Sequence, residues 1–248
     1  MKKSVAIVTG VSHEKGIGAA ACKRLAEAGS DIFFTHWQSA ENWEEQFKQE
    51  IKQYGVRCVG LSIDLANADA AKKLLDRAEK ALGFPTILVN NAAYSTRDGY
   101  QLLDVETLDA HYAVNIRSMA LLCVEFARRF EKQGEAMGRI INLTSGQAQG
   151  PMINELAYVA TKGAISAFTL ALSAEIGHLG ITVNAVNPGP TDTGWMTEEL
   201  KEELAPKFPS KRIGLPDDAA RLIAFLASEK AEWITGQVIN SEGGFFRN

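Results

Sequence analysis

Apolar residues occur along the 248-residue chain in short continuous runs, separated by longer amphipathic stretches. The first run is Val-Ala-Ile-Val at residues 5–8. The candidate strands occupy residues 5–8, 31–34, 56–63, 86–89, 139–143, 181–186 and 237–240. Helical composition is clearest at residues 16–28, 40–54, 67–82 and 155–178. This alternation predicts βαβ units around a parallel sheet.

Strands that are apolar at every position are expected where helices cover both faces of a sheet. No long linker, repeat or low-complexity tract divides the chain. The pattern therefore predicts an α/β fold, a single Rossmann-like domain over residues 1–248 with a doubly wound parallel sheet and helices on both faces. One stretch, residues 194–214, breaks the pattern with Trp195, Met196, three lysines, one arginine and two prolines. We expect it to form a lid over the substrate.

Composition and charge narrow the choice of function. A formal net charge of −4 gives no sign of a nucleic-acid or membrane-surface partner. The three cysteines are far apart and form no Cys-x-x-Cys pair, which argues against disulfides and against a zinc or other metal site. The apolar run after Met1 is too short for a signal peptide, and none is long enough to span a membrane. We expect a cytoplasmic protein.

A glycine-rich turn follows the first strand. Gly10 closes that strand, and Gly16, Ile17 and Gly18 open the next helix. Glycines are needed where backbone approaches a pyrophosphate, and a helix N-terminus presents free N–H groups to the phosphates. A plain strand-to-helix turn is the alternative.

Tyr158 and Lys162 are four residues apart within a segment of helical composition, so their side chains share one face. An ammonium group near a phenol favours the phenolate and lowers its pKa, which suits a general acid or base. The alternative is a Tyr–Lys pair at the surface with no role in catalysis. Ser145 directly follows the fifth strand, where open α/β sheets bind ligands.

Two asparagines and a loop complete the candidate site. Asn91 follows the fourth strand, and Asn115 lies among apolar positions of the next helical segment, where a polar amide is unfavourable unless it is used. Residues 187–193, with two prolines and a glycine, form a rigid loop after the sixth strand. Each feature alone has a structural explanation.

Together and in this order, these features resemble the short-chain dehydrogenase/reductase family, and most closely its bacterial 3-oxoacyl-acyl-carrier-protein reductases. The resemblance covers essentially the whole chain, including residues 212–216 and 234–244. The glycine turn departs from it, since five residues separate Gly10 from Gly16 where the family has three. This leaves open whether Ser12 or His13 takes the phosphate-side contact.

The resemblance implies a catalytic triad of Ser145, Tyr158 and Lys162, with Asn115 completing a proton relay. It also implies a nicotinamide dinucleotide cofactor. The residues matched to cofactor contacts are Gly10, Ser12, Lys15, Gly16, Ile17, Gly18, Asp64, Leu65, Asn91, Ala92, Ala93, Tyr158, Lys162, Pro188, Gly189, Thr191 and Thr193.

The second strand ends in His36, Trp37 and Gln38, with no acid to bind the ribose 2′-hydroxyl as NAD enzymes have. Lys15 occupies a position where NADP-preferring relatives carry a cation that could pair with the 2′-phosphate. We therefore expect NADP(H), with NAD less favoured.

The implied reaction is the interconversion of a carbonyl and an alcohol on a small molecule. A 3-oxoacyl thioester, such as one linked to acyl-carrier protein, is one candidate, and a sugar, polyol, ketone or aldehyde is another. A remote alternative is a cofactor-sensing regulator, but such proteins usually lose the tyrosine or the lysine. A basic rim for the acidic carrier could come from Arg128, Arg129 and Lys132, although a solvated helix face explains them as well.

A homotetramer is expected from two apolar regions, since apolar faces left over after a sheet is covered tend to be interfaces. The C-terminal strand, with residues 243–246 beyond it, forms one region. The other comprises two helical segments with Leu121, Leu122, Val124, Phe126, Phe130, Phe168, Leu170, Leu172 and Ile176.

Overall fold

A computed structural model of the chain describes residues 3–245 and shows a seven-stranded, all-parallel sheet in the order β3-β2-β1-β4-β5-β6-β7. The order reverses between β1 and β4, which is the arrangement of a Rossmann-like α/β fold. The strands are β1 (Val5–Val8), β2 (Asp31–His36), β3 (Cys58–Ser62), β4 (Ile87–Asn90), β5 (Gly138–Leu143), β6 (Ile181–Asn187) and β7 (Val238–Asn240).

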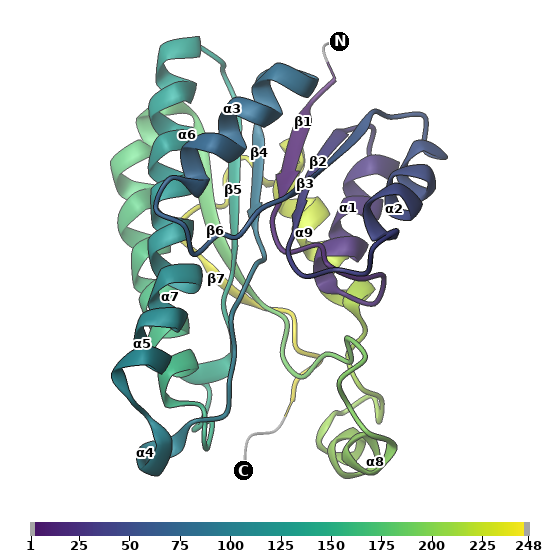
Figure 1. The fold of residues 1–248 in the computed structure, drawn as a ribbon, viewed down its shortest axis with the longest axis vertical. Helices are drawn as coiled ribbons and strands as arrows, with labels where there is room; N and C mark the ends of the chain where they lie inside the picture. The colour runs from purple at the N-terminus through teal and green to yellow at the C-terminus, as the bar shows by residue number, and fades with distance from the viewer. Residues whose placement is uncertain (1–2, 246–248) are drawn as a thin grey trace.

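Helices pack on both faces of the sheet (Figure 1). The α-helices are α1 (Ile17–Glu27), α2 (Trp43–Lys52), α3 (Ala70–Leu82), α4 (Gly99–Leu102), α5 (Val105–His111), α6 (Met119–Gln133), α7 (Leu156–Ile176), α8 (Glu198–Leu204) and α9 (Pro216–Ala227). A π-helical turn, Tyr112–Ser118, joins α5 to α6. Helices α1, α2 and α9 cover one face, and α3, α6 and α7 cover the other.

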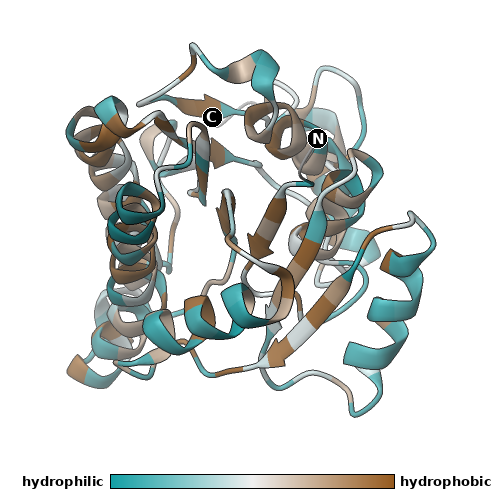
Figure 2. Cartoon of the chain, turned by 90° about the horizontal axis from the view of Figure 1, so that it is seen from above, coloured by the Kyte–Doolittle hydropathy of each residue, from teal (hydrophilic) through white to brown (hydrophobic). Residues whose placement is uncertain are grey.

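Successive strand residues serve opposite cores, which explains the uninterrupted apolar runs. In β1, Ala6 and Val8 belong to the core beneath α1 and α9, whereas Val5 and Ile7 belong to the core beneath α3 and α6. Because successive side chains of a strand point to opposite faces, a strand buried on both faces needs apolar residues at every position. The strands in Figure 2 are accordingly coloured mostly as hydrophobic.

The predicted fold class is confirmed, and the element ends move by at most three residues. The largest strand differences are of two residues: β2 ends at His36 rather than residue 34, and β3 begins at Cys58 rather than residue 56. The helices α4, α5, α8 and α9 were not assigned from the sequence. Helices α4, α5 and α8 have at most seven residues each, so hydrophobic periodicity has few turns to act on. Helix α9 begins at Pro216, and proline is well accommodated in the first turn of a helix.

Among the described residues, one helical stretch, Leu156–Leu179, is long and apolar enough to cross a membrane by length and composition. It contains α7, whose Ile165, Leu172 and Ile176 are buried in the core beneath the sheet. Its apolar composition is therefore accounted for by packing within the protein.

Candidate active site

A pocket of about 530 Å³ lies at the carboxyl ends of the strands, where the strand order reverses. It extends from the end of β2, across the glycine turn, to the start of α7. The predicted residues that line it are Gly10, Ser12, Gly16, Ile17, Asp64, Leu65, Asn91, Ala92, Ala93, Tyr158, Lys162, Pro188 and Thr193. Residues from eight separate segments of the chain therefore line one cavity.

The glycine turn leaves backbone exposed along the pocket because side chains have no room there. Gly10 has a φ of +71°, and a Cβ on it would lie 2.5 Å from the backbone Cα of Ala92. A Cβ on Gly18 would lie 2.6 Å from the amide nitrogen of Asn91. The N-terminus of α1 follows, and its N-cap Gly16 has no side-chain cap. Free N–H groups at a glycine-lined helix start fit the pyrophosphate of a dinucleotide.

Asn91 and Thr9 clamp the end of β4 to this turn. The Asn91 amide donates to the carbonyls of Thr9 at 2.8 Å and Gly10 at 3.0 Å. The Thr9 hydroxyl accepts the N–H groups of Asn91 and Ala92, both at 3.1 Å. The Asn91 side chain is thus used within the protein and sets the shape of the pocket floor.

Tyr158 and Lys162 face the same side of α7, as their spacing predicts. The Lys162 ammonium lies 5.3 Å from the centre of the Tyr158 ring and donates to the carbonyl of Leu143 at 2.7 Å. Lys162 is only 2% exposed, and burial lowers its pKa to about 8. The carbonyl at the end of β5 therefore fixes the lysine beside the phenol.

The pKa of Tyr158 is raised to about 12, which corrects the expectation that Lys162 lowers it. Burial is the largest cause and disfavours the phenolate, the nearby charge of Glu155 acts in the same direction, and a hydrogen bond with Ser145 opposes both. The phenol is accordingly protonated at neutral pH in this structure. The four-residue spacing predicts that Lys162 is near Tyr158 but not how far Tyr158 is buried, so the predicted direction of the pKa shift was wrong.

Ser145 follows β5 after one intervening residue and hydrogen bonds Tyr158, although Ser145 and Asn115 are not among the residues that line the cavity. The Ser145 hydroxyl also lies 3.7 Å from the sulfur of Met152. Two hydroxyl groups from different elements therefore converge where a substrate oxygen could accept both.

Asn115 lies in the π-helical turn and is 1% exposed. Its amide group accepts the N–H of Tyr94 at 2.7 Å, and donates to the Tyr94 carbonyl at 2.9 Å and to the Thr161 hydroxyl at 3.0 Å. The side chain thus joins the loop after β4 to α7, one residue before Lys162. Its direct partners are these residues rather than Lys162.

The end of β2 forms the far wall of the pocket with Trp37 and Gln38. The backbone N–H of Trp37 donates to the Ser12 hydroxyl at 3.2 Å. His13 also lines the cavity. Both candidates for the phosphate-side contact therefore border the pocket. Lys15 does not line the cavity, and its Cδ atom would lie 3.4 Å from a Cβ built on Gly194. This lysine extends toward the start of the lid segment.

Three more predicted contacts, Gly18, Gly189 and Thr191, do not line the cavity. Gly18 is nevertheless required by the close approach of Asn91. The Thr191 hydroxyl bonds the carbonyls of Pro188 at 3.1 Å and Gly189 at 3.2 Å, so it shapes the loop that carries Pro188 and Thr193.

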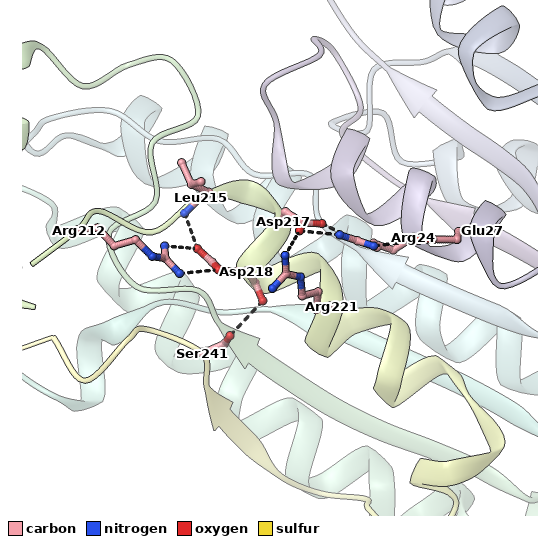
Figure 3. Close-up of polar contacts among 8 residues, drawn as sticks. All are labelled: Arg24, Glu27, Arg212, Leu215, Asp217, Asp218, Arg221 and Ser241. Carbon is pink, nitrogen blue, oxygen red and sulfur yellow. Dashed lines mark hydrogen bonds and ion pairs between the residues drawn. The ribbon is translucent and has the colours of Figure 1, made fainter. Parts of the chain in front are cut away.

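The lid segment is tied down at both ends. At its start the Trp195 indole donates to the Thr191 carbonyl at 3.1 Å, and Lys201 of α8 pairs with Asp192 at 2.8 Å. At its end Arg212 grips Asp218 of α9 with two bonds, of 2.6 and 2.9 Å (Figure 3). The same helix is joined to α1 by Arg24 and Asp217. In Figure 1, α8 lies apart from the sheet layers.

Sequence reasoning missed several lining residues, among them Thr35, Ile63, Tyr94, Val114 and Thr144. Tyr94 carries a usable signal, since it closes the run Asn90-Asn91-Ala92-Ala93 that follows β4. The others are ordinary strand and helix residues, and only the folded chain shows which of them border the pocket.

Comparison with known proteins matches residues 10–246 to the family described as "Enoyl-(Acyl carrier protein) reductase". The chain is 60% identical to the uncharacterized oxidoreductase YjdA of Bacillus subtilis, over 99% of this chain and 98% of that one. It resembles the solved short-chain dehydrogenase/reductase of Serratia marcescens with a TM-score of 0.89 and 33% identity, covering 98% of this chain and 97% of that one. The chain belongs to the short-chain dehydrogenase/reductase family.

Two further proteins similar to the chain have different descriptions. The 3-oxoacyl-[acyl-carrier-protein] reductase FabG of Staphylococcus aureus is 34% identical over 99% of both chains. A blue fluorescent protein from a metagenomic library, solved with NADPH, is 31% identical with a TM-score of 0.88 over 98% of each chain. The chain is thus an oxidoreductase of the class that acts on carbonyls and alcohols.

Proposed function

We propose that this enzyme reduces the carbonyl group of a small ketone or aldehyde with NADPH. The observation that carries the proposal is that Tyr158 and Lys162 line the same pocket as the glycine turn, with Ser145 hydrogen bonded to Tyr158. NADPH, when bound, supplies the hydride. The protein supplies geometry and a proton.

Tyr158 is suited to act as the general acid. With its pKa raised to about 12, the phenol keeps its proton at neutral pH and can donate it to the substrate oxygen as charge develops there. The Ser145 hydroxyl donates to the same oxygen. Lys162, 5.3 Å from the ring, then stabilises the phenolate that remains. Asn115 supports the return of the proton by holding Thr161 and the loop after β4 in place.

The preference for NADP(H) is supported by the residues at the end of β2. His36, Trp37 and Gln38 line the pocket there, and none offers a carboxylate to the ribose 2′-hydroxyl. The NADPH complex of the 31% identical relative agrees with this preference. Because Lys15 extends toward Gly194, we assign recognition of the 2′-phosphate to the lining residues Ser12, His13 and Gln38.

A 3-oxoacyl thioester is the second candidate substrate, favoured by the 34% identity to FabG. A carrier protein would need a basic docking surface near the pocket mouth. The cluster of Arg128, Arg129 and Lys132 does not provide it. Helix α6 ends beside the start of β5, at the amino-terminal ends of the strands, whereas the pocket lies at their carboxyl ends. Arg129 is moreover paired with Asp76, Glu79 and Glu125. This cluster therefore gives the thioester candidate no support.

We infer that the enzyme acts in the cytoplasm. Cys22, Cys58 and Cys123 are all free and buried, as expected for thiols of a reduced compartment. Burial raises the pKa of each thiol, so none is an activated nucleophile.

A substrate panel read through the nicotinamide absorbance tests the proposal. The panel contains small ketones, aldehydes, sugars and acetoacetyl thioesters, each with NADPH and with NADH. We expect turnover of a small carbonyl compound with the higher kcat/KM for NADPH. Tyr158→Phe should lower kcat by roughly 10²–10⁴-fold while keeping cofactor affinity, because the ring remains and the proton donor is lost.

Two results would contradict the proposal. A higher kcat/KM with NADH would refute the cofactor preference, and less than a tenfold loss in folded Tyr158→Phe would show that another group donates the proton. A clear preference for acetoacetyl thioesters would favour the second substrate candidate.

A further inference from the structure

The helix that carries Tyr158 and Lys162 begins without a cap of its own. Its N-cap residue, Glu155, makes no side-chain capping bond. The first backbone N–H groups of a helix have no partner within the helix and need one from elsewhere. Asp98, 58 positions earlier than Leu156, supplies it. Its two carboxylate oxygens accept the N–H of Leu156 and the N–H of Ala157, each at 2.8 Å.

The Asp98 carboxylate is buried and ionised. It is only 6% exposed, and it also accepts the N–H of Gly99 at 2.6 Å. Burial raises its pKa, but the backbone N–H groups of Ala157, Gly99 and Leu156 together lower the pKa below its ordinary value. A negative charge at a helix N-terminus is favourable, and charge-assisted bonds are stronger than neutral ones.

Asp98 also ends the loop that organises the rest of the site. Along residues 91–98, Asn91 bonds the glycine turn and Tyr94 bonds Asn115. The N–H of Asp98 donates to the carbonyl of Asn154 at 3.0 Å, in the segment between Ser145 and α7. This one loop therefore connects the cofactor turn, the π-helical turn and the start of the catalytic helix.

We propose that Asp98 is a positioning residue that sets where Tyr158 lies relative to Ser145. Tyr158 follows directly after Ala157, so a shift of the first turn of α7 moves the phenol with it. Misplacing a reacting group by about 1 Å can cost on the order of 10²-fold in rate. The capping of α7 by Asp98 rests on the hydrogen bonds alone. The effect on catalysis rests on the proposed function.

Asp98→Ala tests the proposal, with Asp104→Ala as the matched control. Asp104 is also a capping aspartate, accepting the N–H of Thr107 at 2.8 Å, but it is exposed and caps α5. Asp98→Ala should lower kcat per folded enzyme by about 10- to 100-fold, with a smaller change in the KM for NADPH. It should also move the tyrosine-dependent limb of the pH profile upward, because the bond from Ser145 to Tyr158 is loosened. Asp104→Ala should leave kcat and the pH profile unchanged.

Hydrogen exchange reports the capping without any substrate. The N–H groups of Leu156 and Ala157 should lose protection in Asp98→Ala and keep it in Asp104→Ala. Unchanged exchange at these groups, or a kcat per folded enzyme within twofold of the unaltered protein, overturns the inference even if Tm falls. A failure of the proposed function is distinguishable, since it appears as no carbonyl-dependent NADPH oxidation by the unaltered protein.

Asp98→Asn decides the matter if Asp98→Ala does not fold. Its amide oxygen can accept one of the two N–H groups, so it should retain part of the protection and lose at least threefold in kcat. Full activity in this variant would contradict a role for the carboxylate in positioning Tyr158.

Discussion

At the scale of single residues, burial sets the protonation states from which catalysis starts. Tyr158 keeps its proton at neutral pH and the pKa of Lys162 falls to about 8, because burial disfavours the charged form of each side chain. The four-residue spacing predicted that the two side chains would be neighbours. The sign of the tyrosine shift depends on how much water the rest of the chain excludes, which no local pattern contains.

A buried ammonium group makes the stability of the folded chain depend on pH. The pKa of Lys162 falls from 10.5 in the unfolded chain to about 8 in the folded one. Between these values the unfolded chain binds more protons, so the free energy of unfolding should rise with pH through this window. Lys162→Met removes the titration while filling similar space.

We therefore expect Lys162→Met to be more stable than the unaltered protein at pH 7, although inactive. This advantage should shrink by on the order of 3 kcal/mol as the pH rises from about 8 to about 10.5. Urea unfolding across that range measures it. Lys72→Met, which replaces an exposed lysine of α3, should show a difference that does not vary with pH. A constant difference for Lys162→Met would mean that Lys162 keeps its ordinary pKa in the fold.

At the scale of elements, hydrophobic periodicity predicts the strands and the long helices. It misses the features that depend on contacts with residues far away in the sequence. β1 and α7 are recognisable because their own residues fill the cores. The start of α7 is not recognisable as a cap, because its capping residue belongs to a distant loop. Lys15 was assigned to the 2′-phosphate from its position beside Gly16, whereas the extended turn directs it toward Gly194.

The lid segment, residues 194–214, has the attachments of an element that can close. Its two ends are held by Thr191 and Asp218, while most of its middle lies at the surface. We expect hydrogen exchange in this segment to slow when NADPH and the alcohol product are added together, since closure would exclude water from the hydride path. Exchange in α9 serves as the internal reference and should stay constant. An equal rate with and without ligands in residues 194–214 would argue against a lid.

At the scale of the whole molecule, folding uses up most of the apolar surface that the sequence suggested for interfaces. Leu122, Phe126, Phe130, Leu172 and Ile176 are buried in the core of the chain itself. A helical pattern cannot separate core residues from interface residues, because both faces are apolar. Of the predicted interface residues, Leu121 and Leu170 remain exposed, and Phe246 lies outside the described residues.

Two groups of exposed apolar residues remain, and each contains one of these two leucines. The first group comprises Val105 and Leu108 of α5, Tyr112 of the π-helical turn and Leu121 of α6. The second lies at the β7 edge and comprises Leu170, Phe225, Trp233 and Val238, with Leu170 placed there by its contact with Gly236. A large indole that is 96% exposed, as Trp233 is, is unfavourable in a monomer. Two distinct twofold interfaces would generate a tetramer with dihedral symmetry.

We therefore expect light scattering to give a mass near four times the 26.9 kDa of one chain at micromolar concentration. Trp233→Glu should break the interface at the β7 edge and Tyr112→Glu the interface along α5, because a charge buried in either contact lacks a partner. Each variant alone should give a dimer, and the two together a monomer. A mass near 26.9 kDa for the unaltered protein would refute assembly. If the unaltered protein is a dimer and only one of the two substitutions dissociates it, then only that substituted face is an interface, and the other face is exposed to solvent.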